Sequence, residues 1–187
     1  QTIYAGTTKV EVAGVKIKAL GSDIRLDRLD VNFTTRPWLN VATITVSDGS
    51  TDLVSYSVTE ANTIEVTVGS SYTVRLTGFN LVIPDGVTKT LSIKVDPKLV
   101  EGDSTETITY QILANGVRGT DGKAIQQYAP SSALTARTFV ISTRTGALNL
   151  SLNAGTPKER GVQGSASVIT EGVELMRFDL KATVNDV

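Results

Sequence analysis

Apolar and polar residues alternate along most of this chain, so that every second side chain of an extended segment lies on the same face. Alternation with a period of two is typical of antiparallel strands that bury one face and expose the other. The pattern predicts about eleven or twelve strands separated by short turns. The clearest alternating segments cover residues 64–68, 72–76, 91–95, 108–112 and 148–152.

Turn-forming residues divide these segments. Asp-Gly-Ser at residues 48–50 is expected to form a hairpin turn, and Pro-Asp-Gly at residues 84–86 a tight turn. Closely spaced glycines indicate that residues 115–132 form one long loop, with a short helical turn near residues 123–127. The predicted fold class is all-β, an immunoglobulin-like antiparallel β-sandwich with more than about 40% strand and less than about 10% helix.

A repeat relates the two ends of the chain. Residues 10–24 (VEVAGVKIKALGSDI) align without gaps with residues 173–187 (VELMRFDLKATVNDV), at an offset of 163 residues. The apolar positions shift from even to odd numbers at residues 13–14, as at a β-bulge or a change of sheet, and the shift recurs at residues 176–177. The alternative is that two unrelated strands share one composition. Five aligned pairs are identical, namely Val10/Val173, Glu11/Glu174, Lys18/Lys181, Ala19/Ala182 and Asp23/Asp186.

The repeat predicts one large module followed by the opening strand of another. We assign residues 1–152 to a β-sandwich module and residues 153–161, which are polar and rich in turn formers, to a linker. Residues 162–187 are assigned to a C-terminal hairpin that begins or contacts the next module. The first residue is Gln1 rather than Met, so we expect a mature product or an excised fragment, and we expect no signal peptide because the chain opens without an apolar segment.

The second copy of the repeat also predicts a surface for assembly. An alternating apolar strand with an unpaired edge promotes association with other chains. We therefore expect residues 172–183 to be paired, either with a strand at 162–169 or with another chain. The side chains expected to carry this assembly are Val173, Leu175, Phe178 and Leu180.

Three segments carry a resemblance to a known class of protein. The segment GTTKVEVAGVKIKALGSDIRLDRLDVNF resembles the opening of large β-sandwich repeat modules in bacterial cell-surface proteins, of S-layer-like or adhesin-like type. The segment FNLVIPDGVTKTLSIKVDP at residues 79–97 resembles a strand–turn–strand of such modules, and residues 148–187 resemble the junction between two of them. The resemblance implies an extracellular or cell-surface location and this architecture. It implies no active-site residue, because the shared motifs are strands and turns.

Composition excludes several kinds of chemistry. The chain has no histidine and no cysteine, which removes disulfides, thiolate nucleophiles, Ser-His-Asp triads and the usual zinc sites. It has 18 Lys and Arg against 19 Asp and Glu, so no basic excess is present to bind nucleic acid. No apolar stretch is long enough to insert into a membrane as a helix. A single tryptophan, Trp38, leaves little for sugar stacking, and we expect it to cover an end of the sandwich.

The sequence contains candidate residues for two further sites. Calcium is the one cofactor with candidate ligands, the acidic residues Asp48 and Asp52 in one segment and Glu101 and Asp103 in another, although neither segment has the spacing of a known calcium loop. The alternative is a pair of solvated turns. Asn32, in a strand near lysine-bearing strands, is a candidate for a Lys–Asn isopeptide bond, against the simpler interpretation that strand lysines face solvent.

The sequence therefore predicts a structural protein. We expect a module of an extracellular surface array, stalk or filament that assembles head-to-tail through its terminal strands, with copies of itself or neighbouring modules as partners. The alternative is an adhesin-type module that recognises a glycan or protein on another cell through the loop at residues 115–132. An enzyme is not expected, because the chain lacks the residues on which most acid–base and nucleophilic catalysis depends.

Overall fold

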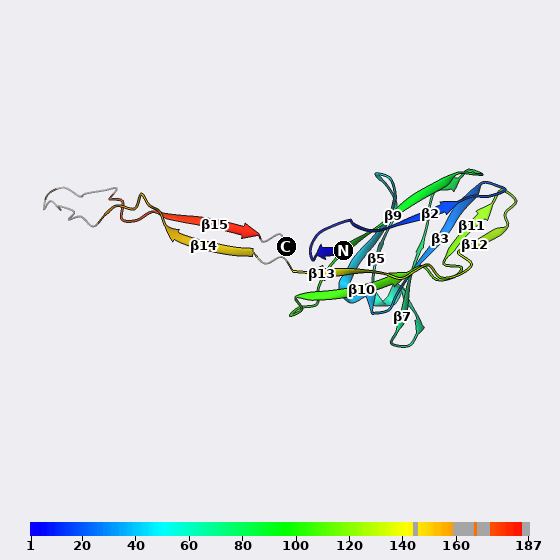
Figure 1. Cartoon of the computed structure of the whole chain (residues 1–187), viewed down its shortest axis with the longest axis horizontal. Helices are drawn as coiled ribbons and strands as arrows, with labels where there is room; N and C mark the ends of the chain where they lie inside the picture. The colour runs from blue at the N-terminus through cyan, green and yellow to red at the C-terminus, as the bar shows by residue number, and fades with distance from the viewer. Residues whose placement is uncertain (144–145, 159–166, 168–172, 185–187) are drawn as a thin grey trace. The chain divides into compact units, whose positions relative to one another are not determined.

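The computed structural model describes residues 1–143, 146–158, 167 and 173–184, in two units, Gln1–Thr143 and Arg144–Val187 (Figure 1). Strands make up 56% of the structure and helix is almost absent, which confirms the predicted all-β class. The short helices are α1 (Pro37–Asn40) and a 3-10 turn, η1 (Glu60–Asn62). None of the helices in these described ranges is long and apolar enough to cross a membrane.

The larger sheet of the first unit is built around β3, which pairs along both of its edges. Strands β10 and β11 pair with one edge of β3, and β7 and β8 pair with the other. Strands β13 and β1 extend the sheet beyond β10, β12 extends it beyond β11, and β6 pairs with β7. The strands are β1 (Thr2–Tyr4), β3 (Ile24–Phe33), β6 (Thr63–Thr67), β7 (Ser71–Thr77), β8 (Val82–Ile83), β10 (Thr105–Gln111), β11 (Val117–Asp121), β12 (Gln126–Ala129) and β13 (Arg137–Ser142).

The smaller sheet of the first unit has four antiparallel strands in the order β2-β9-β4-β5. They are β2 (Val10–Lys18), β9 (Thr88–Pro97), β4 (Val41–Asp48) and β5 (Thr51–Ser57). The expected hairpin turn joins β4 to β5, since Asp48 pairs with Thr51. The expected tight turn joins β8 of the larger sheet to β9 of the smaller one. There Gly86 has a φ of +76°, and the N–H of Val87 donates to the carbonyl of Pro84 over 3.0 Å.

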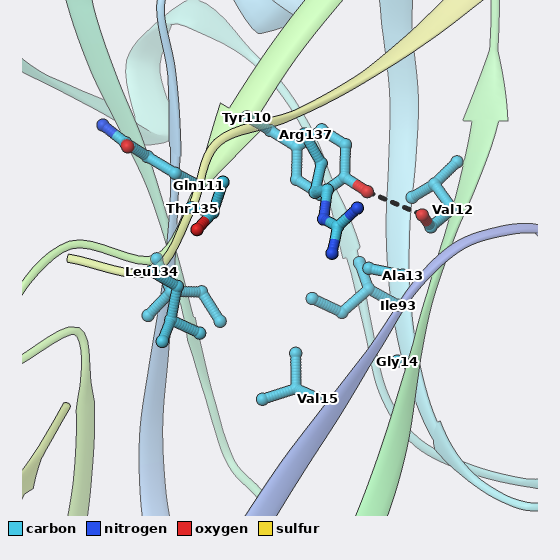
Figure 2. A pocket seen from close by; sticks show the side chains of 11 residues that line it. Val12, Ala13, Gly14, Val15, Ile93, Tyr110, Gln111, Leu134, Thr135 and Arg137 are labelled. Atoms are coloured by element: carbon cyan, nitrogen blue, oxygen red, sulfur yellow. Dashed lines mark hydrogen bonds between the residues drawn. The ribbon is translucent and has the colours of Figure 1, made fainter. Parts of the chain in front are cut away.

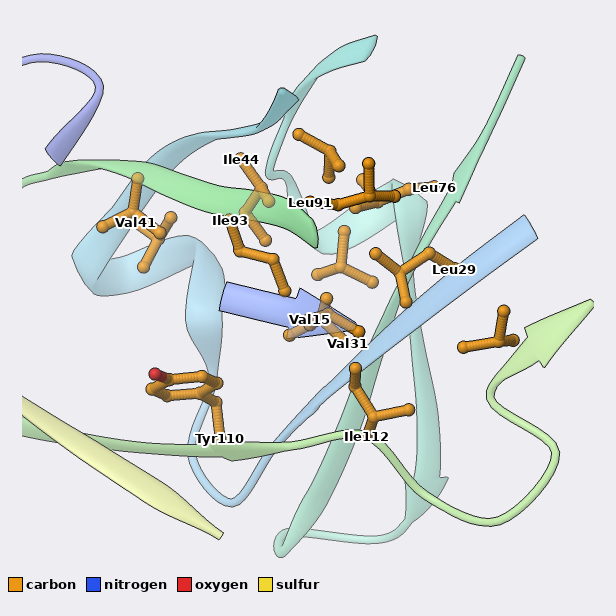
Figure 3. Packing of buried hydrophobic residues seen from close by; sticks show 14 of the residues in the cluster. Val15, Leu29, Val31, Val41, Ile44, Leu76, Leu91, Ile93, Tyr110 and Ile112 are labelled. Atoms are coloured by element: carbon orange, nitrogen blue, oxygen red, sulfur yellow. The ribbon is translucent and has the colours of Figure 1, made fainter. Parts of the chain in front are cut away.

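The two sheets pack on one hydrophobic cluster (Figure 3). Leu29 and Val31 of β3 are buried, as are Ile44 of β4 and Leu91 and Ile93 of β9. Burying a Val, Leu or Ile side chain stabilises a fold by about 1.5–3 kcal/mol. The first unit is therefore a β-sandwich, and its core consists of the alternating apolar residues from which a sandwich was predicted. Trp38, as expected, packs against this cluster at α1, edge-on to Tyr72 with ring centroids 5.4 Å apart.

A β-bulge interrupts β2. Glu11 pairs with Lys94 and Ala13 pairs with Ile93, so Val12 is the extra residue. The bulge accounts for the phase shift in the alternation, one residue earlier than the sequence placed it. After the bulge, the odd-numbered Val15 is buried, as the shifted alternation requires.

The prediction of a long loop at residues 115–132 is wrong. The segment contains the hairpin β11–β12, and β11 is hydrogen-bonded along β3. The glycines are there for close packing, because a Cβ on Gly119 would lie 2.4 Å from Cγ2 of Ile24. The hydroxyl of Thr120 donates to the carboxylate of Asp27 and lowers the pKa of Asp27 below its usual range. A glycine that permits close approach and a glycine that permits flexibility look alike in a sequence.

The alternation also predicted a buried face at residues 64–68, and this prediction is wrong. The alternating residues Ile64, Val66 and Val68 are all exposed, by 43%, 55% and 88%. Ile64 and Val66 line a surface hollow with Arg28 and Asp30. Their strand lies at the end of the larger sheet, where alternation sets the face of each side chain but not which face is covered.

The second unit contains a two-stranded antiparallel sheet, which we call the β14–β15 ribbon, from β14 (Gly146–Leu152) and β15 (Phe178–Val184). The expected module boundary after residue 152 therefore differs from the structure, in which the first unit ends at Thr143 and β14 belongs to the second. Strand β15 pairs with β14, so the expected pairing of residues 172–183 is found for 178–183 with a different partner, while residues 173–177 are not part of a strand. Most of the proposed partner strand at 162–169 lies outside the described residues.

Candidate functional site

The assembly residues predicted from the sequence lie at the surface of the second unit. Leu175, Phe178 and Leu180 are exposed by 80%, 57% and 60%, and Val173 is half-buried. Phe178 and Leu180 point to the same face of β15, because alternate side chains of a strand share a face. The structure therefore leaves these apolar side chains largely in contact with solvent.

Strand β14 adds apolar side chains to the same face. Leu150 pairs directly with Leu180, and Leu152 pairs with Phe178. Directly opposed residues of an antiparallel pair project to one side, so these four side chains form one surface, which we call the ribbon face. Leu150 and Leu152 are 67% and 69% exposed. The opposite side of the ribbon carries Asn149, Ser151, Asp179 and Lys181. The ribbon is therefore amphipathic, and each of the four side chains of the ribbon face is more than half exposed.

Hydrogen bonds at one end of the ribbon fix its register. The side-chain amide of Asn153 donates to Asp179 Oδ1 over 2.7 Å, and the Thr156 hydroxyl donates to the carbonyl of Arg177 over 2.8 Å. The Arg177 guanidinium pairs with the Glu174 carboxylate, which raises the pKa of Arg177. Residues 153–156, which the sequence assigned to a linker, thus form a turn bonded to the second strand of the ribbon.

A groove opens in the first unit between the two sheets (Figure 2). Its volume is about 500 Å³, and β2 forms one wall with Val12, Ala13, Gly14 and Val15. The larger sheet and the segment leading to β13 form the other wall, with Tyr110, Gln111, Ile112, Leu134, Thr135 and Arg137. The lining is mainly aliphatic, and Arg137 and the hydroxyl of Tyr110 lie at one end.

Tyr110 joins the two walls of this groove. Its hydroxyl donates to the carbonyl of Val12, the bulged residue of β2, over 2.6 Å. Burial raises the pKa of Tyr110, an effect that the charge of Arg137 opposes. The sequence identified both the bulge and the alternating strand that contains Tyr110, but nothing in it indicated that the two would be bonded.

A second hollow continues along the same strand. It has a volume of about 460 Å³, and residues 17–22, which end β2 and follow it, line one side except for Ala19. Strands β3, β11 and β12 line the other side, where Tyr128 is 51% exposed. Strand β2 is therefore bordered by two hollows, whose linings combine aliphatic side chains with charged ones, among them Lys18, Asp121 and Arg137.

The calcium candidates are placed differently from what a calcium site requires. Lys89 Nζ lies 2.7 Å from Asp48 Oδ2, and Lys9 Nζ lies 2.6 Å from Asp52 Oδ2. The bond from Lys9 lowers the pKa of Asp52, helped by the hydroxyl of Ser47. Lysine ammonium groups thus occupy the positions where a cation would bind. Glu101 and Asp103 lie in an exposed turn, and no group of three or more acidic residues suited to a metal ion occurs in the described part of the chain.

The candidate for an isopeptide bond has other partners. Asn32 is buried in β3, and its side-chain amide donates to the hydroxyls of Ser71 and Thr73 over 2.9 and 3.1 Å. Hydrogen bonds to hydroxyl groups satisfy this amide within the larger sheet, with no lysine among its hydrogen-bond partners in the described residues. The arrangement is that of a buried polar side chain that fixes strand register.

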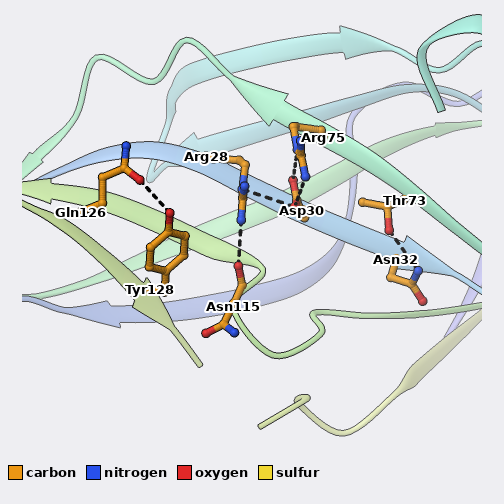
Figure 4. A network of polar contacts seen from close by, with 8 residues as sticks. All are labelled: Arg28, Asp30, Asn32, Thr73, Arg75, Asn115, Gln126 and Tyr128. Atoms are coloured by element: carbon orange, nitrogen blue, oxygen red, sulfur yellow. Dashed lines mark hydrogen bonds and ion pairs between the residues drawn. The ribbon is translucent and has the colours of Figure 1, made fainter. Parts of the chain in front are cut away.

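A polar cluster beside Asn32 has a similar structural role (Figure 4). The guanidinium of Arg75 binds both carboxylate oxygens of Asp30, over 3.0 and 3.1 Å, which raises the pKa of Arg75. Arg28 Nη2 donates to the carbonyl of Asn115 over 2.9 Å, and the Arg28 guanidinium lies over the ring of Tyr128. These contacts tie β7 and the segment that leads into the β11–β12 hairpin to β3.

Comparisons with family models, with curated proteins and with solved structures found no match.

Proposed function

We propose that this chain is a structural module of an extracellular surface array, stalk or filament, and that it assembles head-to-tail through its terminal strands. The observation that carries the proposal is the ribbon face, formed by Leu150, Leu152, Phe178 and Leu180. A two-stranded sheet is marginally stable on its own in water, and it gains stability when its apolar face is covered. A surface of this kind is suited to association.

The expected partner is another copy of the chain or a neighbouring module. The aligned copies at residues 10–24 and 173–187 support this, because β15 has the apolar pattern of a strand that packs within a sandwich of this type. A head-to-tail contact that does not close into a ring produces a filament. Repetition of one contact would therefore be enough to build a stalk or an array.

The class of the β-sandwich and the location of the module are part of the same proposal. We assign the sandwich to the immunoglobulin-like class and the module to S-layer-like or adhesin-like surface proteins, on the resemblance of residues 79–97 and of the two end segments. The strand–turn–strand at 79–97 joins the two sheets of the sandwich through the turn at Gly86. A turn in this role is structural and supports an architectural function.

We propose no enzymatic activity and no cofactor. The chain has neither histidine nor cysteine, and the acidic side chains of the polar cluster and of the β4–β5 hairpin are bonded to arginine or lysine. The alternative, an adhesin-type binding module, depended on a long loop at residues 115–132. That segment is a hydrogen-bonded hairpin, so the alternative loses the adaptable surface assigned to it and ranks second.

The proposal is tested by removing the ribbon. Cutting after Thr156 would leave β14 without β15, so the informative cut is after Thr143, where the first unit ends. We expect the chain 1–143 to remain folded, with its Trp38 fluorescence unchanged, and to be monomeric by light scattering, while the full chain forms larger species. Equal association of both chains would contradict the proposal.

A further inference from the structure

The outer edge of β15, which faces away from β14, carries backbone groups of the apolar residues. Among the described residues, β15 pairs with β14 alone, in a two-stranded sheet (Figure 1). The N–H of Asn153 donates to the carbonyl of Arg177 over 3.0 Å, so the odd-numbered residues of β15 direct their N–H and C=O groups to β14. The even-numbered residues Phe178 and Leu180 therefore direct theirs to the outer edge.

This arrangement decides which way a second copy of β15 would fit. Phe178 and Leu180 lie on the apolar side of the ribbon, and Asp179 and Lys181 lie on the polar side. Residues that exchange hydrogen bonds in an antiparallel pair oppose each other and project to one side, so an antiparallel second β15 continues the apolar side. In a parallel pair, opposed residues direct their backbone groups to opposite edges, so a parallel second β15 would place polar residues beside Phe178 and Leu180.

We propose that β15 of one copy pairs antiparallel with β15 of a second copy, about a two-fold axis at Leu180. Residues 178–182 of one copy then face residues 182–178 of the other. The two ribbons form one four-stranded sheet in the order β14-β15-β15-β14, with the ribbon faces of both copies on one side. A sheet of three or more strands with an apolar face is more stable than an isolated two-stranded one.

The charged residues on the polar side are self-complementary in this register. Within the ribbon, Asp179 lies opposite Ser151, and its Oδ1 accepts the side-chain amide of Asn153 over 2.7 Å. Lys181 lies opposite Asn149, so neither charged residue is directly opposed by a charge within the ribbon. In the proposed register, Asp179 of each copy falls opposite Lys181 of the other, and Oδ2 of Asp179 is available to the ammonium group. Two ion pairs form.

The two neighbouring registers oppose like charges. With the axis at Asp179, that residue faces its own counterpart, and Arg177 faces Lys181. With the axis at Lys181, two lysines face each other. Like charges directly opposed across two strands are destabilising, so both registers are disfavoured. The axis at Leu180 lies between them and replaces like charges with opposite ones.

The edge of β14 has no such charge pattern. Its polar side carries Asn149 and Ser151, which are uncharged, so pairing of β15 with β14 of a second copy forms no ion pair. Self-pairing of β15 is therefore favoured. The apolar contact at Leu180 is needed as well, because exposed ion pairs contribute little free energy on their own.

This contact goes beyond the head-to-tail contact of the proposed function. A two-fold contact uses the same surface on both chains and closes after two copies, whereas a head-to-tail contact repeats. The first uses the outer edge of β15 and the second uses the ribbon face, so both can act in one assembly. The β15 contact would then join the chains of a stalk or filament in pairs.

Disulfide trapping tests the register directly, because the chain contains no native cysteine. Asp179 and Lys181 would oppose each other at a pair without backbone hydrogen bonds, where Cα atoms are about 4.5 Å apart, a distance that a disulfide bridges. Full-length D179C chains are mixed with full-length K181C chains and oxidised mildly. A mixed dimer keeps one of the two ion pairs, because its second Asp179–Lys181 contact joins native residues.

We expect the mixture to form a disulfide-linked dimer. Each variant alone should give at most about one-tenth as much, because two copies of one cysteine would lie diagonally, about 7–8 Å apart, too far for a disulfide. D179C alone would crosslink only with the axis at residue 179, and K181C alone only with the axis at residue 181. A mixture of V68C with K181C measures chance collisions, since Val68 is 88% exposed in the first unit.

Charge exchange gives a second readout that needs no crosslink. D179K alone or K181D alone opposes like charges at both ion pairs, and either should weaken dimerisation at least about fivefold in sedimentation velocity. Mixing the two variants should restore dimerisation, because both pairs of the mixed dimer again have opposite charges. The double variant D179K/K181D should restore it for the same reason, and it is the matched control for loss of the native side chains.

The results separate this inference from the proposed function. If the mixture crosslinks no better than the V68C control and charge exchange has no effect, the β15 edge is not a contact and the inference is overturned, while assembly through the ribbon face stands if the native chain associates. If either single variant crosslinks as well as the mixture, the register is overturned. If the native chain stops at a dimer that crosslinks as expected, the β15 contact stands and the head-to-tail assembly fails.

Discussion

The hydroxyl of Tyr110 in the larger sheet donates a 2.6 Å hydrogen bond to the carbonyl of Val12 in the smaller sheet. A bulge leaves its extra residue outside the regular ladder, so the carbonyl of Val12 is available to a side chain. The bond therefore joins the two sheets at the place where β2 changes phase.

Removing this bond should destabilise the first unit. Tyr110→Phe deletes the donor and leaves the Val12 carbonyl without it, which should cost about 1–2 kcal/mol of unfolding free energy. Urea unfolding followed by the fluorescence of Trp38, the only tryptophan, reports on the first unit. Tyr128→Phe is the control, since its hydroxyl bonds only to the exposed Gln126 side chain, and it should change stability by less than about 0.5 kcal/mol. Equal effects would contradict this account of the bulge.

The raised pKa of Tyr110 predicts that the unfolding free energy of the first unit depends on pH in the alkaline range. Burial raises the pKa of Tyr110 in the folded chain above the value of about 10 for an unfolded tyrosine. The folded state therefore retains its proton where the unfolded state loses it, and stability from this group is complete below pH 10 and lost as the pH rises through the folded pKa. Above pH 10 the unfolding free energy of the native chain should fall more steeply than that of Tyr110→Phe. Parallel curves would show that Tyr110 titrates normally.

Substitution of two glycines by alanine should affect stability differently. A Cβ at Gly119 would lie 2.4 Å from Cγ2 of Ile24 and 3.0 Å from the carbonyl oxygen of Arg25, whereas a Cβ at Gly14 meets nothing closer than 3.7 Å. Gly119→Ala should destabilise the first unit by about 1–3 kcal/mol, through the forced separation of β11 from β3. Gly14→Ala should lie within about 0.5 kcal/mol of the native chain. The comparison uses the same urea unfolding curves, and a neutral Gly119→Ala would show that the segment is as loose as a long loop.

Calcium should have no effect on the stability of the first unit. Asp48 and Asp52 are bonded to Lys89 and Lys9, and a cation would have to displace these ammonium groups. Thermal unfolding in excess calcium and in excess EDTA should agree within about 1 °C, because a ligand that binds only the folded state raises the melting temperature. A rise of several degrees in calcium would show that the acidic turns bind it.

The alternation of apolar and polar residues predicted most strands correctly. Its limits follow from its being a property of neighbouring residues only. Period-two alternation located the strands around Leu76, Ile93 and Ile108, because each buries one face. It gave the wrong environment for Val66, since alternation does not indicate which face of a sheet is covered. The glycines near Gly119 suggested a loop, because a sequence does not show that another strand approaches closely.

The ribbon face was predicted only in part, because a local pattern does not specify which strands pair. The repeat identified Phe178 and Leu180 as apolar positions of a strand, and the structure shows that strand paired and those side chains exposed. Alternation at residues 148–152 predicted the strand that became β14. Its pairing with β15 was not predicted, because pairing between residues about thirty positions apart depends on register that alternation alone does not define. The groove beside Val15 depends on the spacing of two sheets, which no local pattern contains.

The most direct test of the central claim is sedimentation velocity of the full chain over a range of concentrations, compared with the double variant Phe178→Ser/Leu180→Ser. Val68→Ser, which removes an apolar side chain that is 88% exposed in the first unit, is the matched control. We predict that the native chain and the control shift to larger sedimentation coefficients as concentration rises, while the double variant remains a monomer. Identical behaviour of all three chains would contradict assembly through the ribbon face.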